Sequence, residues 1–197
     1  MLALTFDDGP DPRGTPAVLD ALAQVGVRAT FFVLAERVEA HPDLLERVRA
    51  AGHDVQIHGY GHLRHPYTSR EDGEHDSVRA LKVVPDATKW RIPWGHLAEY
   101  TQALAAERDL QIVGWDADTH DWRGDSAEDM LALLRLEPGS IVLAHDGVGT
   151  GARRATARET ARLVRPLVEH ARARGLEPGP LLDPWPVPIP LGNPNFA

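Results

Sequence analysis

The chain has 197 residues, of which 43% are hydrophobic and 25% charged, and its formal net charge at pH 7 is -8. This composition is typical of one globular domain, and the 21 basic residues form no concentrated basic surface of the kind that a nucleic-acid partner requires. Because there is no cysteine, disulfides, thiolate metal ligands and thiol nucleophiles are excluded.

Short apolar runs alternate along the chain with longer helical patterns. This alternation predicts successive strand–helix units and a mainly parallel sheet, hence the α/β class. The predicted strands are Leu2–Phe6, Arg28–Val33, Asp54–Ile57, Thr88–Ile92, Gln111–Asp116 and Ser140–Ala144, and Leu176–Leu182 is a candidate for a seventh.

The helices between these strands are marked by residues that begin and end them. In the stretch "TPAVLDALAQVG", Thr15 is a candidate N-cap and Gly26 ends the helix. Residues 41–52 repeat this arrangement. Pro166 predicts a kink or a division into two shorter helices in the last helical stretch. The further helical stretches are residues 97–109, 126–139 and 155–174.

The two ends of the chain have distinctive compositions. Residues 181–197, "LLDPWPVPIPLGNPNFA", are too rich in proline for a helix or a central strand, so we expect one domain over residues 1–180 and a tail. The tail is either an extended strap on the domain or a disordered segment. At the other end, Met1 leads into a strand without a basic region or a long apolar stretch, so no signal peptide and no membrane span are expected.

Polar residues follow the carboxyl ends of nearly all the predicted strands. Such ends share one face in α/β barrels and open α/β sheets, so residues far apart in the sequence are expected to lie close together there. In chain order these residues are Asp7, Asp8, His58, His62, Arg91, Trp94, Asp118, Asp121 and His145.

Two of these groups suggest a metal site. His58 and His62 are four residues apart and can bind one ion, and an oxygen ligand from elsewhere would leave a position open for water. Asp7 and Asp8 point different ways from a strand end, so one can bind the ion while the other acts as a base. Each pattern alone also has a structural explanation, such as surface histidines, an aspartate-capped turn or a surface ion pair.

Five short stretches taken together are more specific. "TFDDGP", "HGYGH", "RIPWG", "DTHDW" and "LAH" occur in this order from Thr5 to His145, about three quarters of the chain. The set resembles the five motifs of the polysaccharide deacetylase family, the NodB homology domain of carbohydrate esterase family 4. The resemblance implies a distorted (β/α)7 barrel, which agrees with the six or seven predicted strands.

The resemblance also implies roles for individual residues. Asp7 would be the general base, positioned by Arg91. Its reference pKa of about 3.9 would keep Asp7 ionised, and the neighbouring charge of Arg91 would support this. A divalent metal ion, most often Zn²⁺ but also Co²⁺, Ni²⁺ or Mn²⁺, would be bound by Asp8, His58 and His62. The other implied roles are a backbone amide of Trp94 for the oxyanion, His145 as general acid, Asp121 as the residue that tunes it, and Trp122 and Leu143 as walls of the acetyl pocket.

Two residues depart from the pattern of the family. Trp94 stands where tyrosine is commonest, which should matter little if its backbone amide is what acts. The second motif usually has serine or threonine after its first histidine, and that hydroxyl braces the loop, whereas this chain has Gly59. The rigidity of the loop, and with it the affinity for metal, is therefore an open question.

The expected function is that of a metal-dependent hydrolase. It would remove N-acetyl groups from an amino-sugar polymer or oligomer of the chitooligosaccharide or peptidoglycan type, by attack of a metal-bound water. The alternatives are an O-acetyl esterase of the xylan type, an amidase for small amides, and a catalytically silent sugar-binding module. The expected partner is an acetylated glycan, with no nucleic acid and no membrane, and the oligomeric state is not predicted. The chain as written would be cytoplasmic, although the resemblance would also allow export.

Overall fold

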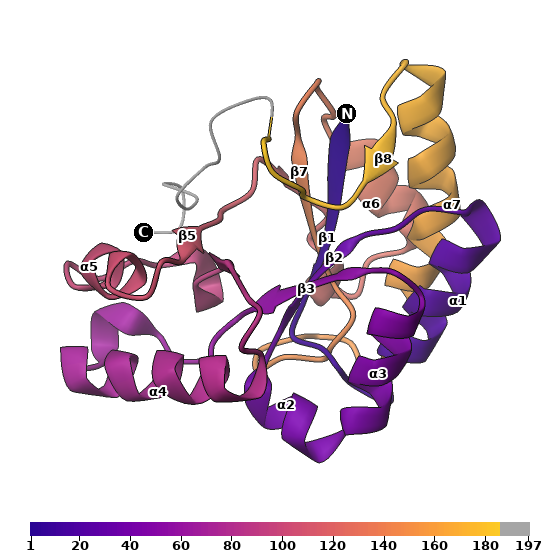
Figure 1. The fold of residues 1–197 in the computed structure, drawn as a ribbon. Coiled ribbons are helices and arrows are strands. Elements are labelled where there is room, and N and C mark those ends of the chain that lie inside the picture. The colour runs from indigo at the N-terminus through magenta and orange to yellow at the C-terminus, as the bar shows by residue number, and fades with distance from the viewer. Residues whose placement is uncertain (186–197) are drawn as a thin grey trace.

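The computed structural model describes residues 1–185 and contains one parallel sheet that curls into a half-barrel (Figure 1). The strands follow the order β5-β4-β3-β2-β1-β7-β6, and β8 pairs with β1. The predicted α/β fold of the distorted (β/α)7 barrel type is thereby confirmed. The strands are β1 Leu2–Asp7, β2 Thr30–Val33, β3 Asp54–Ile57, β4 Lys89–Trp90, β5 Gln111–Ile112, β6 Ala117–Asp118, β7 Ile141–His145 and β8 Pro178–Gly179.

Helices cover the outer face of the sheet. Helices α1 and α7 pack together on one flank, and α4 and α5 pack together on the other (Figure 1). Among residues 1–185, no helix combines the length and the apolar character needed to cross a membrane. The α-helices are α1 Thr15–Val25, α2 Ala35–Ala40, α3 Pro42–Ala50, α4 Arg70–Val83, α5 Thr101–Ala106, α6 Ala127–Leu133 and α7 Arg158–Ala173. The 3-10 turns are η1 His65–Tyr67, η2 Pro93–Gly95 and η3 Asp121–Arg123.

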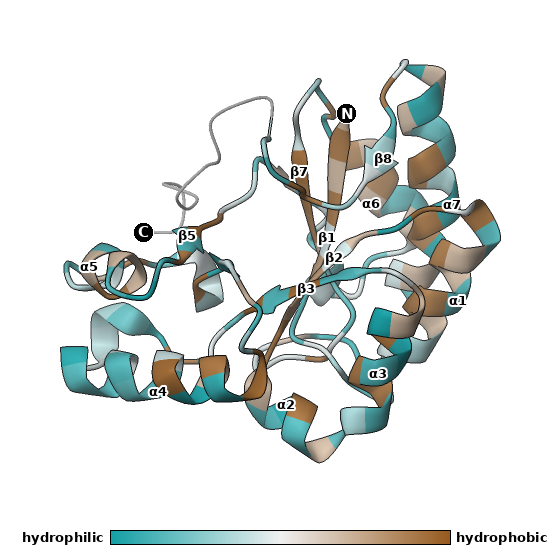
Figure 2. Ribbon diagram, in the orientation of Figure 1, coloured by the Kyte–Doolittle hydropathy of each residue, from teal (hydrophilic) through white to brown (hydrophobic). Residues whose placement is uncertain are grey.

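Side chains of the central strands alternate between two hydrophobic layers. In β1, Leu4 and Phe6 pack in the layer under the helices, whereas Ala3 belongs to a smaller cluster on the concave side. Alternate residues of a strand face the same side, so Asp7 also points to the concave side. Figure 2 shows the apolar colouring of β1 and β7 at the centre of the molecule. The concave cluster consists of Ala3, Phe32, Val113, Trp115, Ile141, Leu143 and Leu181.

The register of the strands aligns the polar residues at their carboxyl ends. Asp7 is paired with His145 of β7. Ile57 of β3 is paired with the residue that precedes Arg91. His58 and Arg91 therefore leave their strands at one level and on the concave side, because each lies one residue beyond an outward-facing position. This register explains why the strand ends form a common site.

The first residues of the proline-rich tail close the other end of the concave side. Leu181 is fully buried in the concave cluster, and its N–H donates to Thr30 Oγ1 at 2.9 Å. Asp183 Oδ2 lies 2.6 Å from Nζ of the buried Lys89. Residues 181–185, here called the C-terminal strap, thus contact the amino ends of β2 and β4.

The strap agrees with one of the two predictions for the tail. The indole Nε1 of Trp185 donates to the Gly139 carbonyl oxygen at 3.0 Å, so this tryptophan packs at the closed end of the half-barrel. The remaining tail residues, 186–197, lie outside the described part of the chain. The predicted boundary at residue 180 stays a prediction.

Replacing Leu181 with alanine is expected to lower the free energy of unfolding by about 2–5 kcal/mol, because it leaves a cavity at the centre of the concave cluster. The matched control is Leu182→Ala, since Leu182 is 49% exposed and exposed substitutions change stability by about 0.5 kcal/mol or less. Urea unfolding of both variants measures the difference. Equal losses in the two variants would show that the strap does not complete the core.

Helix α7 runs without interruption from Arg158 to Ala173, although Pro166 lies inside it. Of the two predicted outcomes, the division into two shorter helices was therefore wrong, and the kink stays a prediction. An internal proline costs a helix about 3 kcal/mol. Burial of an apolar face offsets this cost, at about 1.5–3 kcal/mol for each side chain. That face consists of Leu163, Val164, Leu167 and Val168.

The start of helix α1 also differs from the prediction. Gly14, not Thr15, is the N-cap, and the helix makes no side-chain cap hydrogen bond. The Thr15 hydroxyl instead accepts from Asp11 N at 2.8 Å and donates to the buried Asp146. The Thr15 hydroxyl makes these two contacts and therefore does not cap the helix. Gly26 ends the helix with φ of 65°, as predicted.

Two helices and one break in a strand were not predicted. Helix α2 is short, and α4 lies in the charged stretch after the histidine motif. Ser69 and Asp72 form a capping box that begins α4, a sequence signal that the nearby Gly73 obscured. The predicted strand 111–116 is shorter in the structure, where β5 ends at Ile112 and a separate strand, β6, begins only at Ala117. Between them the Gly114 carbonyl accepts from Arg91.

Candidate active site

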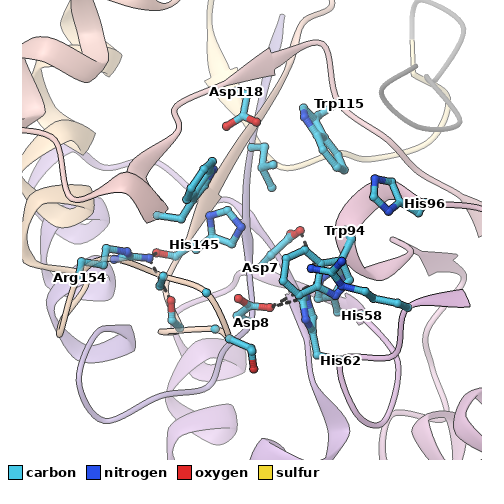
Figure 3. Close-up of a pocket in the computed structure, with 18 residues that line it drawn as sticks. Asp7, Asp8, His58, His62, Trp94, His96, Trp115, Asp118, His145 and Arg154 are labelled. Atoms are coloured by element: carbon cyan, nitrogen blue, oxygen red, sulfur yellow. Dashed lines mark hydrogen bonds and ion pairs between the residues drawn. The ribbon is translucent and has the colours of Figure 1, made fainter. Parts of the chain in front are cut away.

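Asp8, His58 and His62 converge at the carboxyl ends of β1 and β3 (Figure 3). Asp8 Oδ1 lies 3.6 Å from His58 Nε2 and 3.4 Å from His62 Nε2. Asp8 Oδ1 is also buried and has no hydrogen-bond partner within residues 1–185. A buried carboxylate oxygen without a partner is costly, so this arrangement fits an oxygen ligand for a cation.

The histidines are in the neutral form that binds metal ions. His58 Nδ1 lies 2.8 Å from the Arg91 carbonyl oxygen. A carbonyl only accepts, so Nδ1 carries the proton and the lone pair of Nε2 faces Asp8. Burial lowers the pKa of His58 to about 3 and also lowers the pKa of His62. One carboxylate and two neutral imidazoles match the ligands of a divalent ion that keeps a position open for water.

The backbone around Asp8 is unusual. Its φ of 70° lies in the left-handed region, which few residues other than glycine adopt. This conformation turns the Asp8 carboxylate toward the histidines, whereas Asp7 keeps the direction of the strand. The loop after β7 also approaches closely, since a Cβ at Gly149 would lie 2.2 Å from Asp8 Oδ2. Glycine is therefore required where this loop passes the cluster.

Asp7 lies beside the cluster and is paired with the fully buried Arg91. Arg91 Nη1 donates to Asp7 Oδ1 at 2.8 Å and to Thr5 Oγ1 at 2.6 Å. Its Nη2 donates to the Gly114 carbonyl oxygen at 3.0 Å. The guanidinium also packs over the Phe32 ring, 4.2 Å from its centroid. These contacts hold Asp7 in one orientation.

The pKa of Asp7 is raised above its ordinary value. Burial raises it, while the charges of Arg91 and His145 oppose the rise. The expectation that the ordinary pKa of Asp7 and the charge of Arg91 keep it ionised was therefore incomplete, because desolvation has the larger effect. A bound cation would lower the pKa again. A carboxylate in this position remains a good proton acceptor, since a base works best when its pKa lies near the working pH.

His145 lies on the other side of Asp7 (Figure 3). It is paired with Asp121 of η3. His145 Nδ1 lies 2.7 Å from Asp121 Oδ1, and His145 N donates to Asp121 Oδ2 at 3.0 Å. Asp121 Oδ2 also accepts from Thr160 Oγ1 at 2.6 Å and lies 3.3 Å from Arg154 Nη2. Asp121 is thus surrounded by donors.

These contacts determine the charge states of the pair. Burial alone would lower the pKa of His145, but the Asp121 carboxylate raises it to about 9. Burial alone would raise the pKa of Asp121, but His145 lowers it to about 2. Near neutral pH, His145 is therefore protonated and Asp121 is ionised.

A cavity of about 320 Å³ surrounds these groups. The Trp94 ring lies 4.9 Å from that of His62, between centroids, and the Arg64 guanidinium lies 3.7 Å above the Trp94 ring. Trp122 and Leu143 also line the cavity. The structure thus places eight of the ten predicted site residues on its wall, and Arg91 and Asp121 directly behind Asp7 and His145.

Several supporting residues were missed by the sequence analysis. Arg154 Nη2 donates to the carbonyl oxygens of His145 and Gly147, both at 3.0 Å, and so fixes the loop after β7. Thr160 lies in the stretch predicted only as an arginine-rich helix, residues 155–174, and Arg154 directly precedes that stretch; neither belongs to a motif. Trp115 also lines the cavity. It lies inside the predicted strand 111–116, so the sequence did not mark it as a residue at a strand end.

Comparisons with known proteins agree with the motifs. Residues 1–113 match the family model described as "Polysaccharide deacetylase". A chitooligosaccharide deacetylase of Bradyrhizobium sp. is 39% identical over 194 aligned residues, covering 90% of this chain and 87% of the relative. A peptidoglycan-N-acetylglucosamine deacetylase of Bacillus cereus is 34% identical over 155 residues, covering 75% of this chain and 56% of the relative.

Solved structures share the fold. The family 4 carbohydrate esterase from Streptomyces lividans in complex with acetate has a TM-score of 0.83 at 25% identity, covering 98% of this chain and 97% of that one. A family 4 pseudoenzyme from Bacillus anthracis has a TM-score of 0.81 at 19% identity, covering 92% of this chain and 63% of that one, which shows likeness of fold alone. From the matching family model and the Bradyrhizobium relative, the chain belongs to the polysaccharide deacetylase family and has the NodB-type domain of carbohydrate esterase family 4.

Proposed function

We propose that this protein removes N-acetyl groups from an amino-sugar oligomer or polymer of the chitooligosaccharide or peptidoglycan type. The observation that carries the proposal is one cavity in which a buried carboxylate lies between an Asp-His-His cluster and a histidine–aspartate pair. The names of the two relatives support the class of substrate. A pseudoenzyme shares the fold, so the proposal depends on these side chains and not on the fold.

Asp8, His58 and His62 are the proposed metal ligands. The donor set of two imidazoles and one carboxylate supports Zn²⁺ as the ion, with Co²⁺, Ni²⁺ or Mn²⁺ as alternatives. When bound, a divalent ion polarises the acetyl carbonyl and lowers the pKa of its water to about 7. The ligand residues would contribute by holding three donor atoms within 4.8 Å of one another.

Asp7 is the proposed general base. Its Oδ1 is occupied by Arg91, whereas its Oδ2 lies 3.8 Å from His58 Nε2 and so borders the metal ligands. One oxygen therefore orients the carboxylate, and the other is available to take a proton from the attacking water.

His145 is the proposed general acid. Nδ1 of His145 is bonded to Asp121, which leaves the proton on Nε2 for the departing sugar amine. Acid and base are separated by their environments, since His145 is protonated and Asp7 is a carboxylate. The backbone amide of Trp94 is proposed to stabilise the developing oxyanion, and Trp122 and Leu143 to enclose the acetyl methyl group.

The pH dependence of catalysis is expected to follow His145. Its acid form is present at neutral pH and is lost as the pH rises through the folded pKa, which Asp121 raises from 6.5 to about 9. A bound cation lowers the pKa of His145, so kcat is expected to decline at a pH between these two pKa values. In Asp121→Asn the negative charge is lost, and the decline is expected at lower pH. Profiles of kcat against pH in both proteins measure the shift, and an unchanged decline would contradict the pairing.

The substrate class is tested by acetate release from a panel of purified substrates. The panel contains N-acetylglucosamine oligomers, peptidoglycan fragments, acetylated xylan and small acetamides. Release is expected from the amino-sugar substrates and to be lost after chelation. Release only from xylan would indicate the O-acetyl esterase, and release only from small acetamides the amidase. Binding of glycans without any release would indicate the sugar-binding module.

A further inference from the structure

The segment that carries both histidine ligands is fixed from outside by a side chain of α4. This segment, residues 58–62, is called the metal loop below. Asp76 Oδ2 accepts from Tyr60 N and Asp76 Oδ1 accepts from Gly61 N, both at 2.8 Å. Asp76 is only 6% exposed. Each of its carboxylate oxygens is thus directed at one backbone N–H between the two histidines.

The opposite side of the metal loop is held by helix α2. The Gly59 carbonyl oxygen accepts from Ala35 N, and the Tyr60 carbonyl oxygen accepts from Glu36 N, both at 3.0 Å. The carbonyl groups of the loop therefore bind the amino end of one helix, while its N–H groups bind Asp76. The contacts with α2 join backbone groups, whereas the two hydrogen bonds with Asp76 are made by a side chain. A substitution at Asp76 can therefore remove them.

Gly59 and Asp76 fit each other closely. Gly59 has φ of 95°, a conformation that favours glycine, and a Cβ at this position would lie 2.6 Å from Asp76 Oδ2. The same Cβ would lie 3.1 Å from the Gly61 carbonyl oxygen. A serine or threonine at position 59 is therefore incompatible with Asp76 where it stands. The Asp76 carboxylate thus occupies the space that a hydroxyl-bearing side chain at position 59 would need.

We propose that Asp76 positions the metal loop in this chain, and that the pair of Gly59 and Asp76 takes the role that a hydroxyl after the first histidine has in the family pattern. Asp76 contacts no ligand atom, so it acts through the backbone of the loop. The inference rests on the proposed function only in that the loop is taken to bind a metal ion.

Loss of the Asp76 carboxylate would leave two N–H groups of the loop without their partner. The loop would then sample other conformations, and binding would have to restore the arrangement of the two histidines. Outer contacts of this kind typically change metal affinity by about 10–100-fold. The expected effect is therefore on the affinity for the ion, before any effect on the chemistry of the substrate.

The first experiment measures the zinc affinity of the whole chain by competition with a chelator, and the visible absorption of its Co²⁺ form. Asp76→Ala is expected to bind zinc about 10–100-fold more weakly and to change the Co²⁺ spectrum. Asp76→Asn, which keeps one acceptor oxygen, is expected to fall between it and the wild type. It also provides a second reading if the alanine variant folds poorly.

The matched control is Asp72→Ala. Asp72 lies on the same helix and stabilises it through the capping box with Ser69, but it is exposed and makes no contact with the metal loop. This control is expected to lower the melting temperature and leave the zinc affinity and the Co²⁺ spectrum unchanged. Wild-type affinity in Asp76→Ala, or an equal loss in Asp72→Ala, would overturn the inference.

A second experiment places serine at position 59, the residue type that the family pattern favours. Gly59→Ser is expected to weaken zinc binding, because its Cβ would collide with Asp76. In the Asp76→Ala background the same change is expected to cost less, since the collision with the carboxylate is gone. The backbone strain and the close approach to the Gly61 carbonyl oxygen remain. Equal costs in the two backgrounds, or tighter binding in Gly59→Ser, would count against the pairing of these residues.

These measurements separate the inference from the proposed function. A protein whose zinc affinity depends on Asp76 as expected, but which releases no acetate, would support the positioning role and contradict the deacetylase. A wild-type protein that binds no zinc would overturn both.

Discussion

Replacing Asp7 with asparagine is expected to reduce acetate release by about 10²–10⁴-fold while the protein still binds one equivalent of zinc. The asparagine cannot take a proton from water, so the proposed base is lost. Its amide oxygen can still accept from Arg91, which now donates to Asp7 Oδ1 at 2.8 Å. Asp8, His58 and His62 are untouched, so binding of the ion is expected to persist.

Initial rates on N-acetylglucosamine oligomers and the zinc content of the same samples test this expectation. Asp20→Asn, an exposed change of the same chemistry on α1, is the control and is expected to keep the wild-type rate. Turnover by Asp7→Asn within a few-fold of the wild type would remove Asp7 from its proposed role. Loss of zinc together with activity would show instead that Asp7 is a ligand.

Replacing His145 with alanine is expected to have an effect that depends on the leaving group. With an N-acetyl sugar, the departing amine needs a proton, and the loss of the general acid is expected to lower kcat by about 10²–10⁴-fold. With p-nitrophenyl acetate, the departing phenolate is stable without a proton, so a much smaller loss is expected. The protonated His145 and its bond to Asp121 are the basis of this difference.

The ratio of the two rates in His145→Ala and in the wild type measures this dependence. Thr160→Val, which removes one donor to Asp121, is expected to give a smaller change in the same direction. An equal loss on both substrates in His145→Ala would show that His145 supports the site in some other way, such as by orienting the substrate.

Much of the fold was predictable because local patterns and tertiary contacts agree. The apolar runs of β1, β2, β3 and β7 are buried as expected, and the turn residues after them bring the motifs to one face. Thr15 shows where the prediction failed: its sequence position suits a cap, but its hydroxyl is bonded to Asp11 and Asp146. A contact with a residue far along the chain is not visible in a local pattern.

The residues of the candidate site were predictable for the same reason. The residues that hold them in place were not. Asp7, Asp8 and His145 belong to short motifs, so the sequence points to them directly. Asp76 and Arg154 lie in stretches without a motif, and their roles appear only when α4 and the loop after β7 fold against the site. Gly59 illustrates the difference, since its departure from the family pattern was visible in the sequence, whereas the carboxylate that compensates for it was not.

The most direct test of the central claim is acetate release from N-acetylglucosamine oligomers during titration of the metal-free protein with zinc, beside His62→Ala. We expect no release without metal, a linear rise to a plateau at one equivalent, and little release from His62→Ala at that equivalent, because Asp8, His58 and His62 act together on one ion. Full release by the metal-free protein, or an unchanged titration in His62→Ala, would contradict this account.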